Sequence, residues 1–477
     1  ILYSAMTMVF EPLFVNDPTT GELLPWLASA WELEDGGTSY LITLRDDVTF
    51  SDGTPLTAED AVFSISRYLG LEGGELEPTL GQARLQAAIA GLEVVDDHQF
   101  RLSFNVTGSA TLLSDLAANP GAAPGFIVPK HVVEELGDVE FNANPVGTGP
   151  FTLVSNEPGL SMAFEANPDY WGEGPYVQRV EFSAVSDLTT RMSQLTVGEA
   201  DIIDAVSGPA IGQLQGSGDV ELVESRMATN QWIAVGGQTN PDSPLSHVEV
   251  RQALSQAIDR EAVVDVLLGG LGAPSFLFSF PASIGFPTEA AESLTRPYDP
   301  EAARALLATA GFSDGFDLEL VAVPTGSEMA NAIAQNWREI GINTTVNVLE
   351  QGELLADLQS EDRKLETRVV LMSTVGMPYR AEIGGTWGTH LNGGAVYGQP
   401  FANPRVGELV VEQASATDPA ARNVLIEELL TLAFEEQVNI PVWYASSIFG
   451  VGPQVESWDI PDGSTYVINL ATLRLAD

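Results

Sequence analysis

The chain has 477 residues, which at about 150 residues per domain predicts two or three domains. It carries 66 acidic and 20 basic residues, so its formal net charge is −46. Binding to nucleic acid requires a basic stripe opposite the phosphates, and the sequence contains none, which excludes a nucleic-acid partner. The same charge argues against docking on an anionic membrane surface. Because cysteine is absent, disulfides, thiol catalysis and thiolate metal sites are excluded as well.

The apolar composition indicates a folded chain in spite of this charge. Hydrophobic residues make up 44% of the sequence, with 20 Phe, 10 Tyr and 8 Trp, which is enough for a large core. No apolar run approaches the roughly 18 residues of a membrane span, and no signal peptide is recognisable. An acidic, lysine-poor surface suits salty surroundings, where ions screen the repulsion between like charges. We therefore expect the acidity to reflect those surroundings rather than a specific role.

The first 185 residues have the sequence pattern of an α+β domain with many turns. Short strand-like runs at 40–44, 98–104 and 151–154 alternate with segments rich in glycine and proline. Thr57 and Asp60 have the spacing of a capped helix start, and an apolar helical face follows them.

A helix-rich segment begins near residue 246. Ser246 and Glu249 have the spacing of a capping box, and Val250 and Leu254 then recur on one helical face. The pattern predicts a helix capped by Ser246. Arg251 lies near the start of this helix among carboxylates, and we expect it to be an ion-pair partner.

The carboxyl half has the clearest pattern, with helices and strands in alternation. Asp299 followed by proline predicts a helix start, and Gly311 can end that helix. Asp418 followed by proline predicts a later helix in the same way. Because helices and strands alternate, crossovers must join the strands, which predicts a largely parallel sheet with helices on its faces. The expected elements are helix 301–310, strand 317–321, helix 329–340, strand 342–348 and strand 368–372.

Motifs for catalysis and metal binding are absent from the sequence. The four histidines, at 98, 131, 247 and 390, are not spaced as metal ligands, and neither HExxH nor a GxSxG elbow occurs. Pairs of carboxylates are everywhere in so acidic a chain and indicate nothing by themselves. We therefore expect no enzymatic activity, no cofactor and no metal site.

Aromatic residues in glycine-rich loops are more informative. Trp387 lies in a Gly-Gly-Thr-Trp-Gly run, Tyr379 and Arg380 precede it, and Tyr397 follows it. Loops carry binding residues more often than core elements do, and aromatic rings offer a large, rigid contact area. The sequence is consistent with two roles for Trp387, which are contact with a ligand and packing within its loop. For Trp232 the alternative to ligand contact is a position in a half-buried strand, because its neighbours are apolar.

Several stretches of the chain resemble one known family, in that family's order and over almost the whole length. The most diagnostic block is Leu-Arg-Asp-Asp-Val-Thr-Phe-Ser-Asp-Gly-Thr-Pro-Leu-Thr-Ala-Glu-Asp at 44–60. The helix Val-Arg-Gln-Ala-Leu-Ser-Gln-Ala-Ile-Asp-Arg at 250–260 is similar to the family's signature helix. The chain thus resembles the extracellular solute-binding proteins of family 5, the dipeptide-, oligopeptide- and nickel-binding proteins of ABC importers. The other matching stretches are 10–13, 24–31, 145–151, 167–171 and 198–202.

The resemblance implies an α/β chain with a periplasmic-binding-protein-like two-lobe fold, of the class II type, and an extra inserted α+β domain. A hinge would join the lobes, and the ligand would be enclosed between them. The first lobe is expected to combine 1–17, 145–240 and 451–477. The inserted domain would be 18–144 and the second lobe 241–450.

The function that the resemblance implies is that of a substrate-binding protein of an ABC importer. Such a protein would capture a peptide or peptide-like small solute between its lobes and deliver it to membrane permease subunits. The alternatives are a nickel, metal-chelate or other non-peptide solute binder of the same family and, outside the family's role, a carboxylate-dependent hydrolase. The expected state is a monomer in the periplasm or outside the cell, with a membrane anchor possible upstream of the present start.

The expected ligand site departs from that of the family's peptide binders. Those proteins commonly hold the peptide amino group with an aspartate, and the corresponding stretch 371–380 contains none. Arg380 would favour a carboxylate or another anion through a bidentate contact, whereas Glu382 could anchor an amine. The expected ligand-binding residues are Trp387, Arg380, Tyr379, Trp232, Tyr397 and Glu382.

Overall fold

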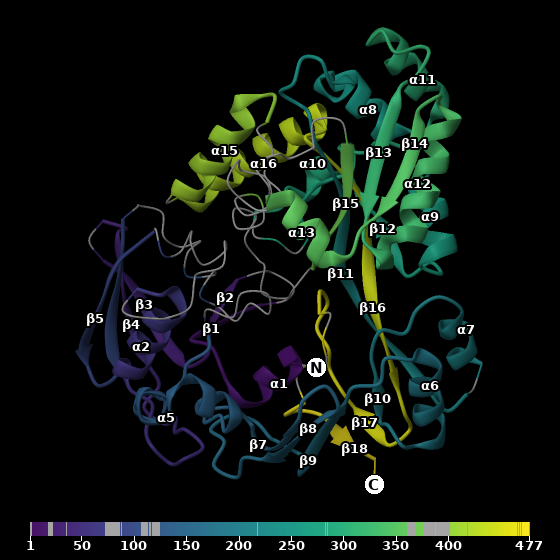
Figure 1. Cartoon of the computed structure of the whole chain (residues 1–477). Coiled ribbons are helices and arrows are strands. Elements are labelled where there is room, and N and C mark those ends of the chain that lie inside the picture. Colours follow the sequence, from purple (N-terminus) through teal and green to yellow (C-terminus); the bar gives the residue numbers. More distant parts are fainter. Residues whose placement is uncertain are drawn as a thin grey trace. The chain divides into compact units, whose positions relative to one another are not determined.

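The structure is a computed structural model, and its elements are labelled in Figure 1. The chain forms two compact units, termed unit 1 and unit 2. Unit 1 is Ile1–Ser225 with Ser447–Asp477, and unit 2 is Arg226–Gly376 with Glu382–Ser446. The residues described are 2–17, 22–34, 36–71, 86, 88–105, 113, 116, 125–216, 218–281, 283, 285–359, 368–375, 387, 401–416, 418–464, 466, 468 and 470–476.

Two long strands carry the chain from one unit to the other. The chain leaves unit 1 within β11 (Glu221–Val235) and returns to it within β16 (Asn439–Val451). The predicted first lobe and inserted domain both fall in unit 1 apart from the segment 226–240. Their separation into two domains, and the enclosure of a ligand between lobes, remain predictions.

A four-stranded antiparallel sheet in the order β3-β4-β6-β5 dominates the first part of unit 1. Its inner side chains, among them Ile42 and Phe100, are fully buried and share a core with Ile65 of helix α2. Helix α2 begins as predicted, because Thr57 and Asp60 form a reciprocal capping box. The elements are β1 (Phe14–Asn16), which pairs with β2 (Leu23–Pro25), then β3 (Ala28–Glu34), β4 (Ser39–Leu44), α2 (Ala58–Leu69), β5 (Ile89–Asp96) and β6 (Gln99–Phe104).

The rest of unit 1 contains a three-stranded antiparallel sheet, β7-β8-β9, and several short helices. Phe151 and Phe164 of this sheet share a core with Met8 of α1 and with Leu470 and Leu473. Strand β10 pairs with the last residues of β16, and β17 pairs with β18. The elements are α1 (Leu2–Val9), α5 (Lys130–Ala143), β7 (Phe151–Glu157), β8 (Ser161–Ala166), β9 (Arg179–Ser183), α6 (Leu188–Val197), β10 (Ile202–Ile203), α7 (Pro209–Gln215), β17 (Val455–Ser457) and β18 (Arg474–Leu475).

The sheet of unit 2 is mixed rather than largely parallel, and the predicted parallel arrangement is found at the end of the sheet formed by β15, β13 and β14. Strand β13 (Asp317–Ala322) runs parallel to both β14 (Asn343–Val348) and β15 (Arg368–Val375). Strand β11 adds to β15 in the antiparallel direction, and β12 (Gly272–Pro274) pairs with β16, also antiparallel. The predicted helix–strand alternation over 299–372 is therefore confirmed.

Helices cover both faces of this sheet. Alternate residues point to opposite faces of a strand, so Leu320 and Val369 enter one buried core whereas Val321 and Val370 enter the other. Helices α8, α9, α11 and α12 line the first core, and α13, α15 and α16 line the second. The helices are α8 (Val248–Gln256), α9 (Arg260–Leu267), α10 (Thr288–Ser293), α11 (Pro300–Thr309), α12 (Ser327–Glu339), α13 (Gln351–Gln359), α15 (Pro404–Ser415) and α16 (Pro419–Glu436).

Two of the three predicted caps in unit 2 are present. The carboxylate of Asp299 accepts hydrogen bonds from two backbone N–H groups in the first turn of α11, and that of Asp418 accepts one in the first turn of α16. The predicted capping box at Ser246 is wrong. Residues 244–246 form a 3₁₀ turn, the hydroxyl of Ser246 donates to the carbonyl of Ser243, and His247 is the N-cap of α8.

Two arginines in the stretch 250–260, Arg251 and Arg260, are buried and hold neighbouring elements together. Arg251, with 1% of its surface exposed, donates to the carbonyls of Leu245, Ser246 and Glu436 at 2.8–3.0 Å. It also forms the predicted ion pair, 3.3 Å from the carboxylate of Glu436. These bonds join the start of α8 to the end of α16. Arg260 has a similar role, because it donates to the carbonyls of Ser255 in α8, Ser275 just after β12 and Pro441 in β16.

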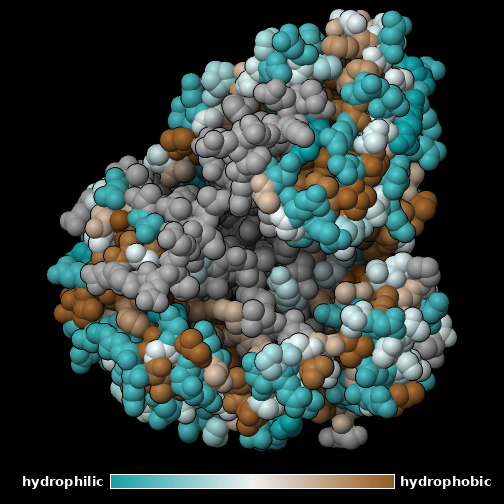
Figure 2. Space-filling model, viewed as in Figure 1, coloured by the Kyte–Doolittle hydropathy of each residue, from teal (hydrophilic) through white to brown (hydrophobic). Residues whose placement is uncertain are grey.

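The surface of the described residues agrees with the acidic composition. Figure 2 shows hydrophilic residues over much of the visible face, with small hydrophobic patches between them. Single exposed apolar residues of this kind are ordinary on folded proteins.

Candidate functional site

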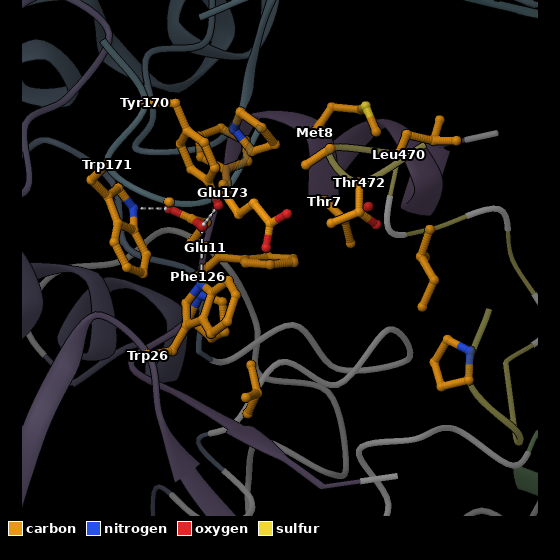
Figure 3. A pocket seen from close by; sticks show the side chains of 18 of the residues that line it. Thr7, Met8, Glu11, Trp26, Phe126, Tyr170, Trp171, Glu173, Leu470 and Thr472 are labelled. Atoms are coloured by element: carbon orange, nitrogen blue, oxygen red, sulfur yellow. Dashed lines mark hydrogen bonds between the residues drawn. The ribbon is translucent and has the colours of Figure 1, made fainter. Parts of the chain in front are cut away.

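A pocket with a volume of about 660 Å³ lies in unit 1. Helix α1, the turn that follows it, the loop at 170–173 and the C-terminal segment 459–472 all contribute to its wall. Figure 3 shows how aromatic side chains from separate parts of the sequence surround it, among them Trp26, Phe126, Tyr170 and Trp171. The pocket is therefore a candidate site for a small solute.

Glu11 holds three of these rings in place. Its carboxylate is buried, with 3% of the residue exposed, and it accepts three hydrogen bonds from side chains. The indole N–H of Trp26 and the hydroxyl of Tyr170 donate to Oε1 at 2.9 and 2.8 Å, and the indole N–H of Trp171 donates to Oε2 at 2.8 Å. Figure 3 shows the three donors converging on the one carboxylate.

The local sequence explains how Glu11 reaches this position. It lies two residues after the end of α1, and its carbonyl accepts a hydrogen bond from Ile127 N–H at 3.0 Å, which fixes the turn. The backbone at 147–149 packs closely on the end of α1, where Gly149 N–H donates to the carbonyl of Val9 at 2.9 Å. A Cβ atom at Gly147 or Gly149 would overlap the Val9 backbone, so glycine is required at both positions.

Burial raises the pKa of Glu11, because a charged carboxylate is poorly solvated there. The hydrogen bonds from Trp171, Tyr170 and Trp26 oppose this rise. Burial and the nearby Glu11 carboxylate also raise the pKa of Tyr170. The phenol therefore stays protonated and continues to donate.

Arg45 contacts one of these rings, that of Trp171. Its guanidinium lies 4.5 Å from the centroid of Trp171, a cation–π contact. Two hydrogen bonds of 2.7 and 2.8 Å pair the same guanidinium with Asp47. The charge of Arg45 is thus compensated before any solute is present.

The pocket is suited to binding rather than to catalysis. The half-buried rings of Trp26, Tyr170 and Trp171 offer rigid contact area, and the exposed carboxylates of Glu173 and Asp459 add negative charge at the wall. Both oxygens of Glu11 already accept hydrogen bonds from ring donors. Among the described residues, no group of acidic or histidine side chains is placed to hold a metal ion.

Replacing Glu11 with glutamine is expected to remove a pH-dependent part of the stability. Because the folded pKa is raised above the ordinary value of 4.5, the contribution of Glu11 to the free energy of unfolding is fully present below that value. It is lost as the pH rises through the folded pKa. Urea unfolding should therefore show that, as the pH is raised from about 4.5 to neutral, the free energy of unfolding of the wild type falls relative to that of Glu11→Gln. A difference independent of pH would contradict the prediction.

The structure places two of the predicted ligand-binding residues in the core of unit 2. Trp232 and Trp387 are both fully buried, with ring centroids 4.5 and 5.5 Å from that of Phe278, which lies between them. The indole N–H of Trp387 donates to the Phe278 carbonyl at 2.9 Å. Core packing accounts for these positions, and ligand contact by either ring remains a prediction. Four further candidates lie outside the described residues: Tyr379, Arg380, Glu382 and Tyr397.

Sequence reasoning missed the pocket in unit 1. The stretches 10–13, 24–31 and 167–171 were part of the resemblance, but only a scaffold role was considered for such shared stretches. The available signal was chemical: those stretches contain acidic residues, Glu11 among them, together with several aromatic residues that carry polar hydrogens. Their convergence is long-range, since Glu11 and Trp171 are 160 residues apart.

The comparison with family models decides the identification. The model of the bacterial extracellular solute-binding proteins, family 5 (middle), matches residues 22–384. The chain belongs to this family. Its members bind solutes rather than catalyse reactions, which agrees with the expectation of no enzymatic activity.

Named relatives of this family-5 chain bind different solutes. Haem-binding protein A of Haemophilus influenzae is 29% identical over 343 residues, which is 68% of this chain and 61% of that protein. The dipeptide-binding protein of Escherichia coli is 28% identical over 358 residues, 70% of this chain and 65% of that protein. The matches thus span less than two thirds of the relatives' own length.

Solved structures confirm the predicted mixed α/β fold of this family. HbpA2 from Haemophilus parasuis superposes with a TM-score of 0.82 at 24% identity, covering 99% of this chain and 95% of that one. The dipeptide-binding protein of a Pseudoalteromonas species, in complex with Met-Leu, gives 0.79 at 22% identity over 99% and 95% of the two chains. No helix within the described part of the family-5 chain is both long and apolar enough to cross a membrane.

Proposed function

We propose that this family-5 chain is the solute-binding component of an ABC importer, which captures a small solute and delivers it to a membrane permease. The observation that carries the proposal is the aromatic pocket of about 660 Å³ in unit 1. Sites for small molecules commonly measure about 300–1,000 Å³ and combine aromatic walls with a few polar groups. The pocket of unit 1 has both properties.

A peptide or peptide-like molecule is the first candidate solute. The dipeptide-binding and glutathione-binding relatives favour this class. Among the residues expected from the sequence, Arg380 would pair with a carboxylate and Glu382 with an amine, and the rings of Tyr379, Tyr397, Trp232 and Trp387 would supply contact area. In unit 1, Glu173 and Asp459 would attract the positive end of such a solute.

A flat, non-peptide solute is the second candidate, because three half-buried rings meet at one pocket. Rings fixed by a buried carboxylate suit a rigid aromatic or macrocyclic surface. The haem-binding relative and a solved nickel-chelate complex of the same fold, NikZ from Campylobacter jejuni with Ni(L-His), supply concrete members of this class to test.

The proposed role places the protein outside the cytoplasmic membrane, in the periplasm or the extracellular space. Closure of two lobes around the solute would present both of them to the permease. A monomer is sufficient for this role.

Thermal-shift screening tests the proposal. The panel holds di- to pentapeptides, glutathione, haemin, nickel with histidine and, as a contrast, neutral oligosaccharides. A solute present at about 100 times its Kd adds roughly 2.7 kcal/mol to the free energy of unfolding, which raises the melting temperature measurably. We expect one class to raise it and the others to leave it unchanged. A melting temperature unaffected by every member of the panel would count against the role.

A further inference from the structure

A second hollow, with a volume of about 530 Å³, lies elsewhere in unit 1 and is here termed the β9 groove. It shares only Leu470 with the aromatic pocket. All five residues of β9 line it, together with residues of α6, β10 and the C-terminal segment. Since side chains of a strand alternate between faces, a groove lined by five consecutive residues runs along the edge of that strand.

The edge of β9 is free for pairing. Strand β9 is the last in the order β7-β8-β9, and among the described residues it pairs with β8 alone (Figure 1). An edge strand offers a row of backbone N–H and C=O groups to any extended segment laid beside it. Adding such a segment to a free edge is a common mode of peptide recognition.

The floor of the groove is apolar and incompletely covered. Val180, Phe182 and Ile202 pack against the core that contains Phe164, yet all three are only half-buried. Leu475, at 48% exposure, extends this surface. A segment placed here would bury apolar area that unit 1 leaves in contact with water.

A half-buried arginine, Arg191, links the two sides of the groove. Arg191 donates to the carbonyls of Val185 and Ser186 at 2.8 and 3.0 Å, just after β9, and to that of Asp204 at 3.4 Å, just after β10. The two sides of the groove are thereby linked before any partner arrives. A pre-formed surface loses little entropy on binding.

The negative charge of the groove favours a partner with basic side chains. Exposed carboxylates of Glu181, Glu199, Asp201 and Asp204 line it, and its two arginines are already paired. Arg191 is held by backbone carbonyls, and Arg179 lies 3.6 Å from Glu181. Glu199 and Asp201 have no ion-pair partner within the described part of the chain.

We infer that the β9 groove docks an extended segment of another protein in which apolar residues alternate with lysine or arginine. The segment adds a fourth strand at β9. Its apolar side chains cover Val180 and Phe182, and its basic side chains face Glu181, Glu199 and Asp201. This docking is separate from solute binding in the aromatic pocket.

The test uses a fluorescein-labelled peptide of alternating lysine and valine, nine residues long, with the intact protein. Fluorescence anisotropy measures binding, and hydrogen exchange locates it. We expect saturable binding, protection of the backbone amides of 179–183, and binding at least about tenfold weaker in the double variant Glu199→Lys/Asp201→Lys. A glutamate–valine peptide and a lysine–valine peptide with N-methylated amides should both bind weakly.

The matched control is the double variant Glu289→Lys/Glu292→Lys on α10 of unit 2, which changes the net charge by the same amount at two exposed positions. It should bind the peptide as the wild type does. Equal weakening in both variants would mean a general charge effect and would overturn the inference. Protection outside 179–183 together with insensitivity to Glu199→Lys/Asp201→Lys would place the peptide in a solute site and would overturn it too.

Discussion

Replacing Arg260 with methionine is expected to lower the free energy of unfolding by about 3–5 kcal/mol. Arg260 is 3% exposed, and its guanidinium donates to the carbonyls of Ser255, Ser275 and Pro441 at 2.8–3.1 Å. Methionine can fill much of the space but offers no donor. Each carbonyl left buried without a partner costs about 1–3 kcal/mol. Burial lowers the pKa of Arg260 to about 9, because its charged form is poorly solvated there.

Urea unfolding followed by tryptophan fluorescence measures this loss. Arg304→Met is the matched control, because Arg304 is exposed and, within the described part of the chain, donates one hydrogen bond, at 2.9 Å to the carbonyl of Glu339. We expect the control to lose no more than about 1 kcal/mol. An Arg260→Met protein as stable as the control would show that the three carbonyls find other donors.

Replacing Trp387 with alanine is also expected to cost about 3–5 kcal/mol of stability. The ring is fully buried beside Phe278, and its indole N–H donates to the carbonyl of that residue. Alanine leaves a cavity in the core that α13, α15 and α16 cover, and it leaves the carbonyl unpaired. Trp387→Phe retains most of the apolar contact and should lose about 1–2 kcal/mol.

The same variants decide between the two roles that the sequence leaves open for Trp387. A core role predicts a low melting temperature for Trp387→Ala and near-normal solute affinity for Trp387→Phe. If Trp387→Ala instead kept its stability within about 1 kcal/mol and lost solute affinity, the ring would be a ligand contact.

Local chemistry made much of unit 2 predictable from the sequence. Asp299 caps N–H groups two and three residues ahead and Asp418 caps one three residues ahead, so their capping roles depend on nearby residues alone. The alternation of helix and strand over 299–372 correctly predicted that β13, β14 and β15 run parallel, but not that antiparallel strands complete the same sheet. At Ser246 the same argument failed, because its hydroxyl donates within a 3₁₀ turn that ends two residues before the first residue of α8.

The candidate site depends on contacts that sequence spacing does not reveal. Trp26 and Trp171 meet at Glu11 from 15 and 160 residues away. Trp232 and Trp387 were singled out because of their surroundings in the sequence, yet Phe278 joins them within a core. Which aromatic ring faces a pocket and which fills a core is decided by such long-range packing.

The most direct test of the account is the solute affinity of Trp26→Ala beside that of Trp31→Ala. Both tryptophans are half-buried in unit 1, but Trp26 lines the aromatic pocket, whereas Trp31 packs edge-on against Phe14 with ring centroids 5.0 Å apart. Titration calorimetry uses the solute that stabilises the wild type most in the thermal-shift panel. We predict at least about tenfold weaker binding for Trp26→Ala and affinity within about twofold of wild type for Trp31→Ala. Equal affinities in both variants and the wild type would contradict the assignment of the pocket as the solute site.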